Sequence, residues 1–264
     1  NGALSNSGSA TLGWRTGAIT NTGNLRASGV LTADSLDNRS STVIADGQSL
    51  TARDGVKNTG NILVQGQLAT NGDAKVENLA DGKLSLDGAL VAADVVNEAG
   101  ALLDIQSSST IAGDLVNRGD LLLSSEEATR LSVRDTFTNS GVVGVDNKNG
   151  FLTIEAGEID LLEGSEVDNT RVALIGAVSN EGELVYRRDS ALTGDLRNTT
   201  NGNIRVLADL DADGFNVMNS GDFVVGAAGD PGRLHGVEAL DNSGQFNINS
   251  GSSVEAGATL NRDG

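Results

Sequence analysis

Short runs in which apolar and polar residues alternate recur along the whole chain. Residues 82–90 read GKLSLDGAL, and residues 23–31 and 60–68 keep the same spacing of glycines and aliphatic residues. Successive side chains of a β-strand point to opposite faces, so each run predicts a short strand with one apolar face. The intervening glycine predicts a bend, either through a positive φ angle or through close approach of another backbone segment.

An asparagine marks almost every repeat, most often as apolar-x-Asn-x-Gly. Successive markers lie mostly 15 to 23 residues apart, with one double gap between Asn139 and Asn180. A period near 20 residues over the whole chain predicts a repeat architecture. The predicted turn asparagines are Asn21, Asn58, Asn78, Asn117, Asn139, Asn180, Asn219 and Asn242. The same spacing includes Asn6, Asn38, Asn97, Asn198 and Asn261.

The chain bends every few residues and returns in phase one period later, which favours parallel stacking over antiparallel hairpins. We therefore predict an all-β fold, a right-handed parallel β-helix (solenoid) with ~20-residue coils and about 13 rungs, forming one domain over residues 1–264 and a rod roughly 60 Å long. The marker asparagines would form an amide ladder at one corner. A leucine-rich repeat has a similar period, but its longer leucine signature and helical return segment are missing.

The repeat weakens in two segments. Residues 144–176 lack the regularly spaced Asn-Gly motif and carry an acidic run from Glu155 to Glu166. The missing motif predicts one coil with a degenerate turn. Residues 224–239 hold the only proline, Pro231, and the only histidine, His235. Because proline cannot donate to a strand ladder, this second segment predicts a surface loop.

Composition excludes several classes of partner. The formal net charge is −18 and the isoelectric point is about 4.2, so long-range repulsion argues against binding to nucleic acid. The chain has no cysteine and 3% aromatic residues, which excludes a disulfide framework and a ring-lined pocket. Without a long apolar run or a signal peptide, we expect no membrane insertion, and we expect the chain to be an internal piece of a longer protein.

The repeats at residues 23–31 and 60–68, followed by Leu-Asp-Asn38 and Val-Glu-Asn78, resemble the haemagglutinin repeats of filamentous haemagglutinin and of CdiA-type contact-dependent growth-inhibition proteins. The resemblance covers nearly the whole chain. It implies a secreted, cell-surface filament of a Gram-negative bacterium, exported through the outer-membrane transporter of a two-partner system. The secretion domain of that family carries Asn-Pro-Asn motifs, which are absent here, so the chain resembles the repeat shaft or a receptor-contact region.

Candidate chemistry is sparse. Asp209, Asp211 and Asp213 copy the start of a calcium loop, but Ser220 stands where a bidentate glutamate is needed, and in a strand these carboxylates simply line the outer face. We otherwise expect no cofactor and no catalytic residue. Three function hypotheses follow. The first is a structural shaft. The second is a binding module that contacts a receptor protein or glycan on a neighbouring cell, with Asp230, Arg233 and His235 as candidate contacts. The third is a β-helical glycan-binding or glycan-cleaving protein, for which the candidate residues are Trp14 and Tyr186-Arg187-Arg188-Asp189.

Overall fold

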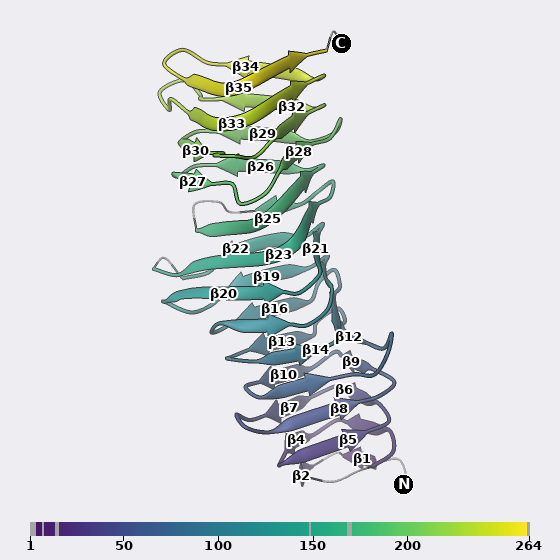
Figure 1. Ribbon diagram of the computed structural model, residues 1–264. Helices are drawn as coiled ribbons and strands as arrows, with labels where there is room; N and C mark the ends of the chain where they lie inside the picture. The colour runs from purple at the N-terminus through teal and green to yellow at the C-terminus, as the bar shows by residue number, and fades with distance from the viewer. Residues whose placement is uncertain (1–3, 7, 14–15, 148, 168–170, 263–264) are drawn as a thin grey trace.

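The computed structural model confirms a parallel β-helix of about 13 rungs and describes residues 4–6, 8–13, 16–147, 149–167 and 171–262. Figure 1 shows the coils stacked along one axis, with the two chain ends at opposite ends of the rod. Every strand pairing within the described ranges is parallel, apart from two isolated antiparallel bridges. None of the described residues lies in an α-helix, so none lies in a helix that crosses a membrane.

Each coil contributes to three parallel faces, here called the asparagine sheet, the second sheet and the third sheet. The asparagine sheet and the third sheet join into one 22-stranded sheet. The asparagine sheet contains the strands that end at the marker residues, and its register aligns each marker with the next, as in Asn58↔Asn78↔Asn97. Its short strands are β1 (Leu4–Asn6), β3 (Ile19–Asn21), β6 (Leu36–Asn38), β9 (Val56–Asn58), β12 (Lys75–Asn78), β15 (Asp94–Asn97), β18 (Leu115–Asn117), β21 (Thr136–Asn139), β28 (Leu196–Asn198) and β31 (Val217–Asn219).

The second sheet follows the asparagine corner and contains 13 strands. Its side chains alternate between the core and the outer surface, as the sequence pattern predicts. The strands are β2 (Ser9–Leu12), β4 (Asn24–Ala27), β7 (Ser41–Ile44), β10 (Asn61–Val64), β13 (Lys83–Leu86), β16 (Leu102–Ile105), β19 (Asp120–Leu123), β22 (Val142–Val145), β24 (Glu166–Val167), β26 (Glu183–Tyr186), β29 (Asn203–Val206), β32 (Asp222–Val225) and β34 (Gln245–Ile248).

The third sheet closes each coil. Its own strands are β5 (Val30–Ala33), β8 (Ser49–Ala52), β11 (Gln67–Ala69), β14 (Leu90–Ala92), β17 (Ser109–Ile111), β20 (Ala128–Val133), β27 (Ser190–Ala191) and β30 (Asp209–Asp211). Four long strands, β23 (Phe151–Leu161), β25 (Val172–Asn180), β33 (Arg233–Asn242) and β35 (Ser253–Asn261), run through both the third sheet and the asparagine sheet. At these levels the two sheets are therefore continuous.

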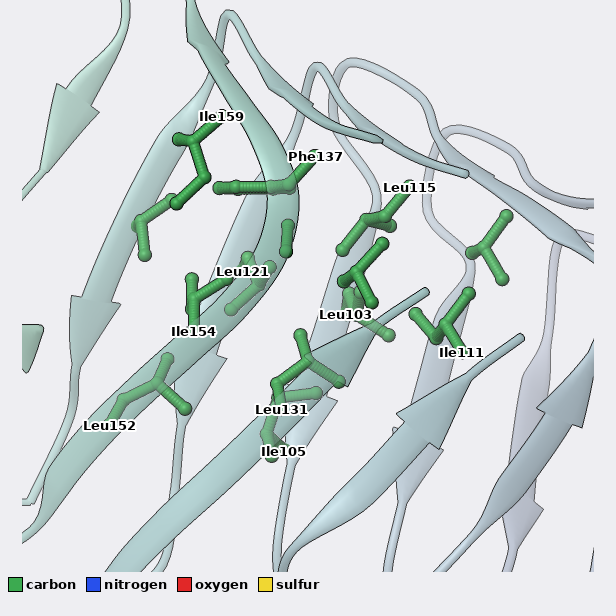
Figure 2. Packing of buried hydrophobic residues seen from close by; sticks show 14 of the residues in the cluster. Leu103, Ile105, Ile111, Leu115, Leu121, Leu131, Phe137, Leu152, Ile154 and Ile159 are labelled. Atoms are coloured by element: carbon green, nitrogen blue, oxygen red, sulfur yellow. The ribbon is translucent and has the colours of Figure 1, made fainter. Parts of the chain in front are cut away.

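The core is a set of aliphatic columns along the rod axis. Leu84 stacks between Ile62 and Leu103 in the second sheet, and all three are essentially inaccessible to solvent. Figure 2 shows how leucines and isoleucines from successive coils fill the space between the sheets, with Phe137 as a rare ring. Each buried aliphatic side chain stabilises the fold by about 1.5–3 kcal/mol, so the stacking of coils supplies the main stabilising contact.

Glycines serve the two kinds of bend in different ways. Gly29 and Gly88, which separate strands of the second and third sheets, have φ angles of +72° and +68°. In the Asn-x-Gly corner, a Cβ atom on Gly60 would lie 2.2 Å from the carbonyl oxygen of Ser40 in the preceding coil. That corner therefore requires glycine because coils touch there, and φ is not the constraint.

The two irregular segments keep the stacking of coils, with one register shift in each: between Glu155 and Glu158 in the pairing of β23 with β25, and between Leu234 and Val237 in the pairing of β33 with β35. Among the described residues of 144–176, strand β23 pairs with both β20 and β21, and Leu161 takes the place of a marker asparagine, as expected for one coil with a degenerate turn. The prediction of a surface loop over residues 224–239 is wrong for most of the segment. Only residues 226–232 leave the strands, and β33 begins at Arg233.

Candidate functional site

The asparagine corner carries a polar network that runs along the described part of the rod. Each marker from Asn6 to Asn242, apart from Asn139, donates from Nδ2 to Oδ1 of the marker in the next coil, at 2.7–2.9 Å. The Nδ2 group also bonds the backbone of a following coil, for example Asn78 to the Leu102 carbonyl at 2.9 Å. Asparagine fits because its amide is both a donor and an acceptor, so an identical side chain continues the ladder in one direction.

The ladder is interrupted once. Asn139 and Asn180 lie two coils apart, and the intervening position is Leu161, which is fully buried. Leucine neither donates nor accepts, so the Oδ1 atom of Asn180 is buried without a hydrogen-bond partner among the described residues. In the sequence, this position is visible only as a marker asparagine missing from the repeat.

Replacing Leu161 with asparagine is expected to change the free energy of unfolding by no more than about 1 kcal/mol. The loss of a buried aliphatic group costs about 1.5–3 kcal/mol. The new amide makes two hydrogen bonds, one of which gives Asn180 Oδ1 a partner, and these stabilise the protein by a similar amount. The control is Leu152→Asn in the same coil, which buries an amide away from the ladder and should cost about 3–5 kcal/mol. Equal losses in urea unfolding of the two variants would contradict the ladder argument.

The three aspartates proposed for calcium lie along the outer surface. Asp209 and Asp211 belong to β30, and the backbone N–H of Asp213 donates to Asp211 Oδ1 at 3.1 Å. In the next coil, His235 Nε2 lies 2.9 Å from Asp209 Oδ1 and Nδ1 lies 3.7 Å from Asp211 Oδ1. The first contact is close but is not a hydrogen bond, since Asp209 Oδ1 has no hydrogen-bond partner in the described part of the chain. The described residues contain no group of three or more His, Cys, Asp or Glu side chains that would hold a metal ion.

The three candidate receptor contacts lie close together but in different settings. Asp230 is exposed in the turn of residues 226–232, where its N–H and carbonyl bond Ala227 at 3.2 and 2.8 Å. Arg233 and His235 lie in β33, aligned with Asp209 and Asp211 of the coil before. Arg233 and His235 can lie in a strand because each has the backbone N–H and carbonyl groups that strand pairing uses. Pro231, which has no N–H, lies in the turn outside the strand.

The acidic run of residues 155–166 is partly neutralised. Arg130 Nε donates to Glu155 at 2.8 Å and lowers the pKa of that carboxyl, although Glu155 remains part of the outer surface. Asp160 behaves in the opposite way: burial raises its pKa, and the neighbouring charges of Glu158 and Glu181 raise it further. The run is therefore an outer surface with one ion pair, Arg130–Glu155, and one carboxylate, Asp160, whose pKa is raised.

A buried carboxylate that the sequence did not single out lies on the outer face of the second sheet. Asp104 in β16 is 2% exposed, its Oδ2 is 2.8 Å from Lys83 Nζ, and it accepts hydrogen bonds from Ser85 and Gln106 at 3.2 and 2.9 Å. Burial by itself would raise the pKa of Asp104, but the hydrogen bonds and the charge of Lys83 outweigh it, so the pKa lies below its ordinary value.

Asp104 is expected to make the rod acid-sensitive. Because its pKa is lower in the folded than in the unfolded chain, its contribution is complete above pH ~4 and is lost as pH falls through the folded pKa. Asp104→Asn should therefore be less stable than the parent at pH 7 by about 1.5–3 kcal/mol, and the difference should shrink at about pH 2–3. Urea unfolding at both pH values measures this. The exposed Asp120→Asn of the next strand is the control, and a constant difference at both pH values would refute the assignment.

Comparisons of this chain with protein-family models, with curated proteins and with solved structures found no match.

Proposed function

We propose that this chain is a rigid shaft segment of a secreted bacterial filamentous adhesin or contact-dependent inhibition protein. Its role in that proposal is length and stiffness, which hold an adhesive or toxic tip away from the cell. The export partner would be the outer-membrane transporter of a two-partner system, acting through a secretion domain outside this sequence. The resemblance of the repeats to haemagglutinin repeats supports the family.

The asparagine ladder is the observation that carries the shaft proposal. It links Asn6 to Asn139 and Asn180 to Asn261 through direct amide bonds, so neighbouring coils are fixed both by the sheets and by a buried polar row. A row of hydrogen-bonded amides aligned along the axis resists bending, because tilting two coils lengthens these bonds at one corner. The surface, with a formal net charge of −18, favours a solvated rod that does not bundle.

Removing one coil should leave a shorter and otherwise intact rod. Deletion of residues 83–101 places Leu102 after Gly82, where Lys83 stood, and brings Asn78 against Asn117. We expect cooperative melting to persist and the longest dimension in small-angle X-ray scattering to fall by about 5 Å. Deletion of residues 83–92 is the control: it joins the chain out of phase, turns the aliphatic columns outward and should prevent folding.

The second candidate function is a receptor-contact segment, favoured by the turn of residues 226–232, in which residues 228–231 are exposed. Labelled protein incubated with epithelial and bacterial cells distinguishes the two. A shaft shows no saturable binding. Saturable binding that disappears when residues 226–232 are replaced by the two-residue bend Ser28-Gly29 of the second coil would overturn the shaft proposal and establish receptor contact.

A further inference from the structure

Three asparagines of the described chain are followed directly by glycine, and none of them belongs to the ladder. They are Asn71, Asn149 and Asn201, and all three are exposed. A further step, Asn1-Gly2, lies outside the described residues. In an Asn-Gly step the backbone nitrogen of glycine can attack the side-chain carbonyl carbon of asparagine, because glycine has no side chain to obstruct the approach and its backbone turns freely. Asn-Gly is therefore the dipeptide in which an asparagine most readily loses its amide.

The glycine nitrogen is free at one of these three steps and engaged at the other two. The N–H of Gly150 donates to the carbonyl of Asn147, and the N–H of Gly202 donates to the carbonyl of Thr199, each at 3.0 Å. Both of these glycines are buried. Gly72 is exposed, and its N–H has no hydrogen-bond partner among the described residues. The nitrogen that would attack is thus available only beside Asn71.

The turn that contains Asn71 holds the backbone of this residue and leaves its side chain free. The turn joins β11 to β12. The N–H of Asn71 donates to the Arg53 carbonyl of the coil before at 3.2 Å, and its own carbonyl accepts from the N–H of Ala74 at 3.1 Å. The side-chain amide of Asn71 makes no hydrogen bond within the described part of the chain. Both reacting groups, the amide and the Gly72 nitrogen, are therefore unengaged and open to water.

The stacking of coils protects the marker asparagines from the same reaction. The N–H that follows a marker is the nitrogen that would attack its side chain. At every marker from Asn21 to Asn261, this N–H donates instead to the carbonyl at the marker position of the coil before, at 2.6–2.9 Å, as from Glu98 to Asn78. The side-chain amides are held as well, since they bond one another along the ladder. Both reacting groups are therefore engaged throughout the ladder.

We propose that Asn71 is a site of spontaneous deamidation in this rod, and that the ladder is protected from it. The Gly72 nitrogen forms a bond to Asn71 Cγ and gives up its proton to solvent, and the Cγ–Nδ2 bond breaks with release of ammonia. Water then opens the succinimide ring. Attack of water at Cγ gives aspartate, whereas attack at the backbone carbonyl carbon of residue 71 gives isoaspartate, in which the chain continues through Cγ.

Either product changes an exposed turn and leaves the strands as they are. Each converted chain gains one negative charge on top of a formal net charge of −18. The converted residue lies between β11 and β12, outside the pairings of both strands. A filament of this kind records its age at one turn, while the amides that join its coils persist. This chemistry is independent of the shaft function, since neither the length of the rod nor its ladder depends on Asn71.

The test incubates the complete 264-residue chain at mildly alkaline pH, folded in buffer and, in parallel, unfolded in urea. Digestion at acidic pH and mass spectrometry measure the conversion of each asparagine, and electron-transfer fragmentation separates isoaspartate from aspartate. In the folded chain we expect Asn71 to convert at least about tenfold faster than Asn149 and Asn201, because their buried glycine N–H groups must first leave their hydrogen bonds. In urea the three rates should agree within about threefold, because those bonds are gone.

A matched pair of variants assigns the acidic product. Anion-exchange chromatography of the aged parent should show a more acidic species, and Asn71→Asp marks its elution position. Asn71→Gln should prevent this species from forming, because the longer side chain closes a larger ring far more slowly, whereas Asn201→Gln should leave its rate within about twofold. Equal rates at the three steps in the folded chain, conversion of Asn78 as fast as that of Asn71, or an acidic species that persists in Asn71→Gln would each overturn the proposal.

Discussion

Replacing Gly141 with alanine is expected to lower the free energy of unfolding by about 3 kcal/mol. A Cβ atom at this position would lie 2.1 Å from the carbonyl oxygen of Gly119, in the coil before. That oxygen accepts the ladder bond from the N–H of Val142 at 3.0 Å, so it cannot move away without breaking the contact between the two coils. Guanidinium unfolding monitored by circular dichroism gives the difference.

Two controls separate the contact between coils from the general effect of an added methyl group. Gly8 occupies the same place in the Asn-x-Gly motif of the first coil, and no described atom lies within 4 Å of its Cβ position, so Gly8→Ala should change stability by less than about 0.5 kcal/mol. Ser140→Ala changes the neighbouring residue of the same corner and should also be small. If Gly8→Ala and Gly141→Ala destabilised the protein equally, the close approach of coils would not be the reason for glycine.

Removing one asparagine from the ladder should cost about 4 kcal/mol. The Asn78 amide accepts from Asn58 Nδ2 at 2.7 Å and donates to Asn97 Oδ1 at 2.7 Å and to the Leu102 carbonyl at 2.9 Å. Asn78→Ala removes all three bonds in a site closed to solvent. Asn97 Oδ1 is then left without a partner, and Asn58 Nδ2 keeps only its bond to the Lys83 carbonyl at 3.1 Å. Each buried unsatisfied group costs about 1–3 kcal/mol.

The matched control for Asn78→Ala is Asn61→Ala, since Asn61 lies in β10 with an exposed side chain and should tolerate the change to within about 0.5 kcal/mol. Hydrogen exchange of the amides of β12 and β15 adds a local measurement. Protection of these strands should fall more than that of β31, because each coil depends on its immediate neighbours. A loss of protection spread evenly over the rod would argue against a local role for the ladder.

The Leu161 coil shows how far such a row tolerates interruption. One leucine in place of asparagine keeps the strand register, and the cost appears as the unpartnered Oδ1 of Asn180. Leucine and asparagine have similar shapes, so the position remains filled while the bond is lost. The rod therefore combines two independent links at this corner, the backbone ladder and the side-chain row.

The sequence by itself determined the period, the strand positions and the residues that face the core. Alternation in a run such as residues 82–90 decides which side chains point inward, and a return in phase after about 20 residues forces identical residues to stack. The regular spacing of the marker asparagines likewise predicted an amide ladder at one corner. These features are local and repeated, so they can be read from the sequence alone.

Only the tertiary structure decided the features that depend on the coil above or below. Whether a glycine is needed for its φ angle, as at Gly88, or for close approach, as at Gly60, depends on a neighbour in another coil. Arg233 belongs to a strand because it pairs with β30 on one side and β35 on the other, and His235 because it pairs with Asp211 of β30. Ser190 lies beside Leu210, about 20 residues away in sequence, because the two residues are in direct register in space. Stacking turns distant residues into nearest neighbours, and no single repeat contains that information.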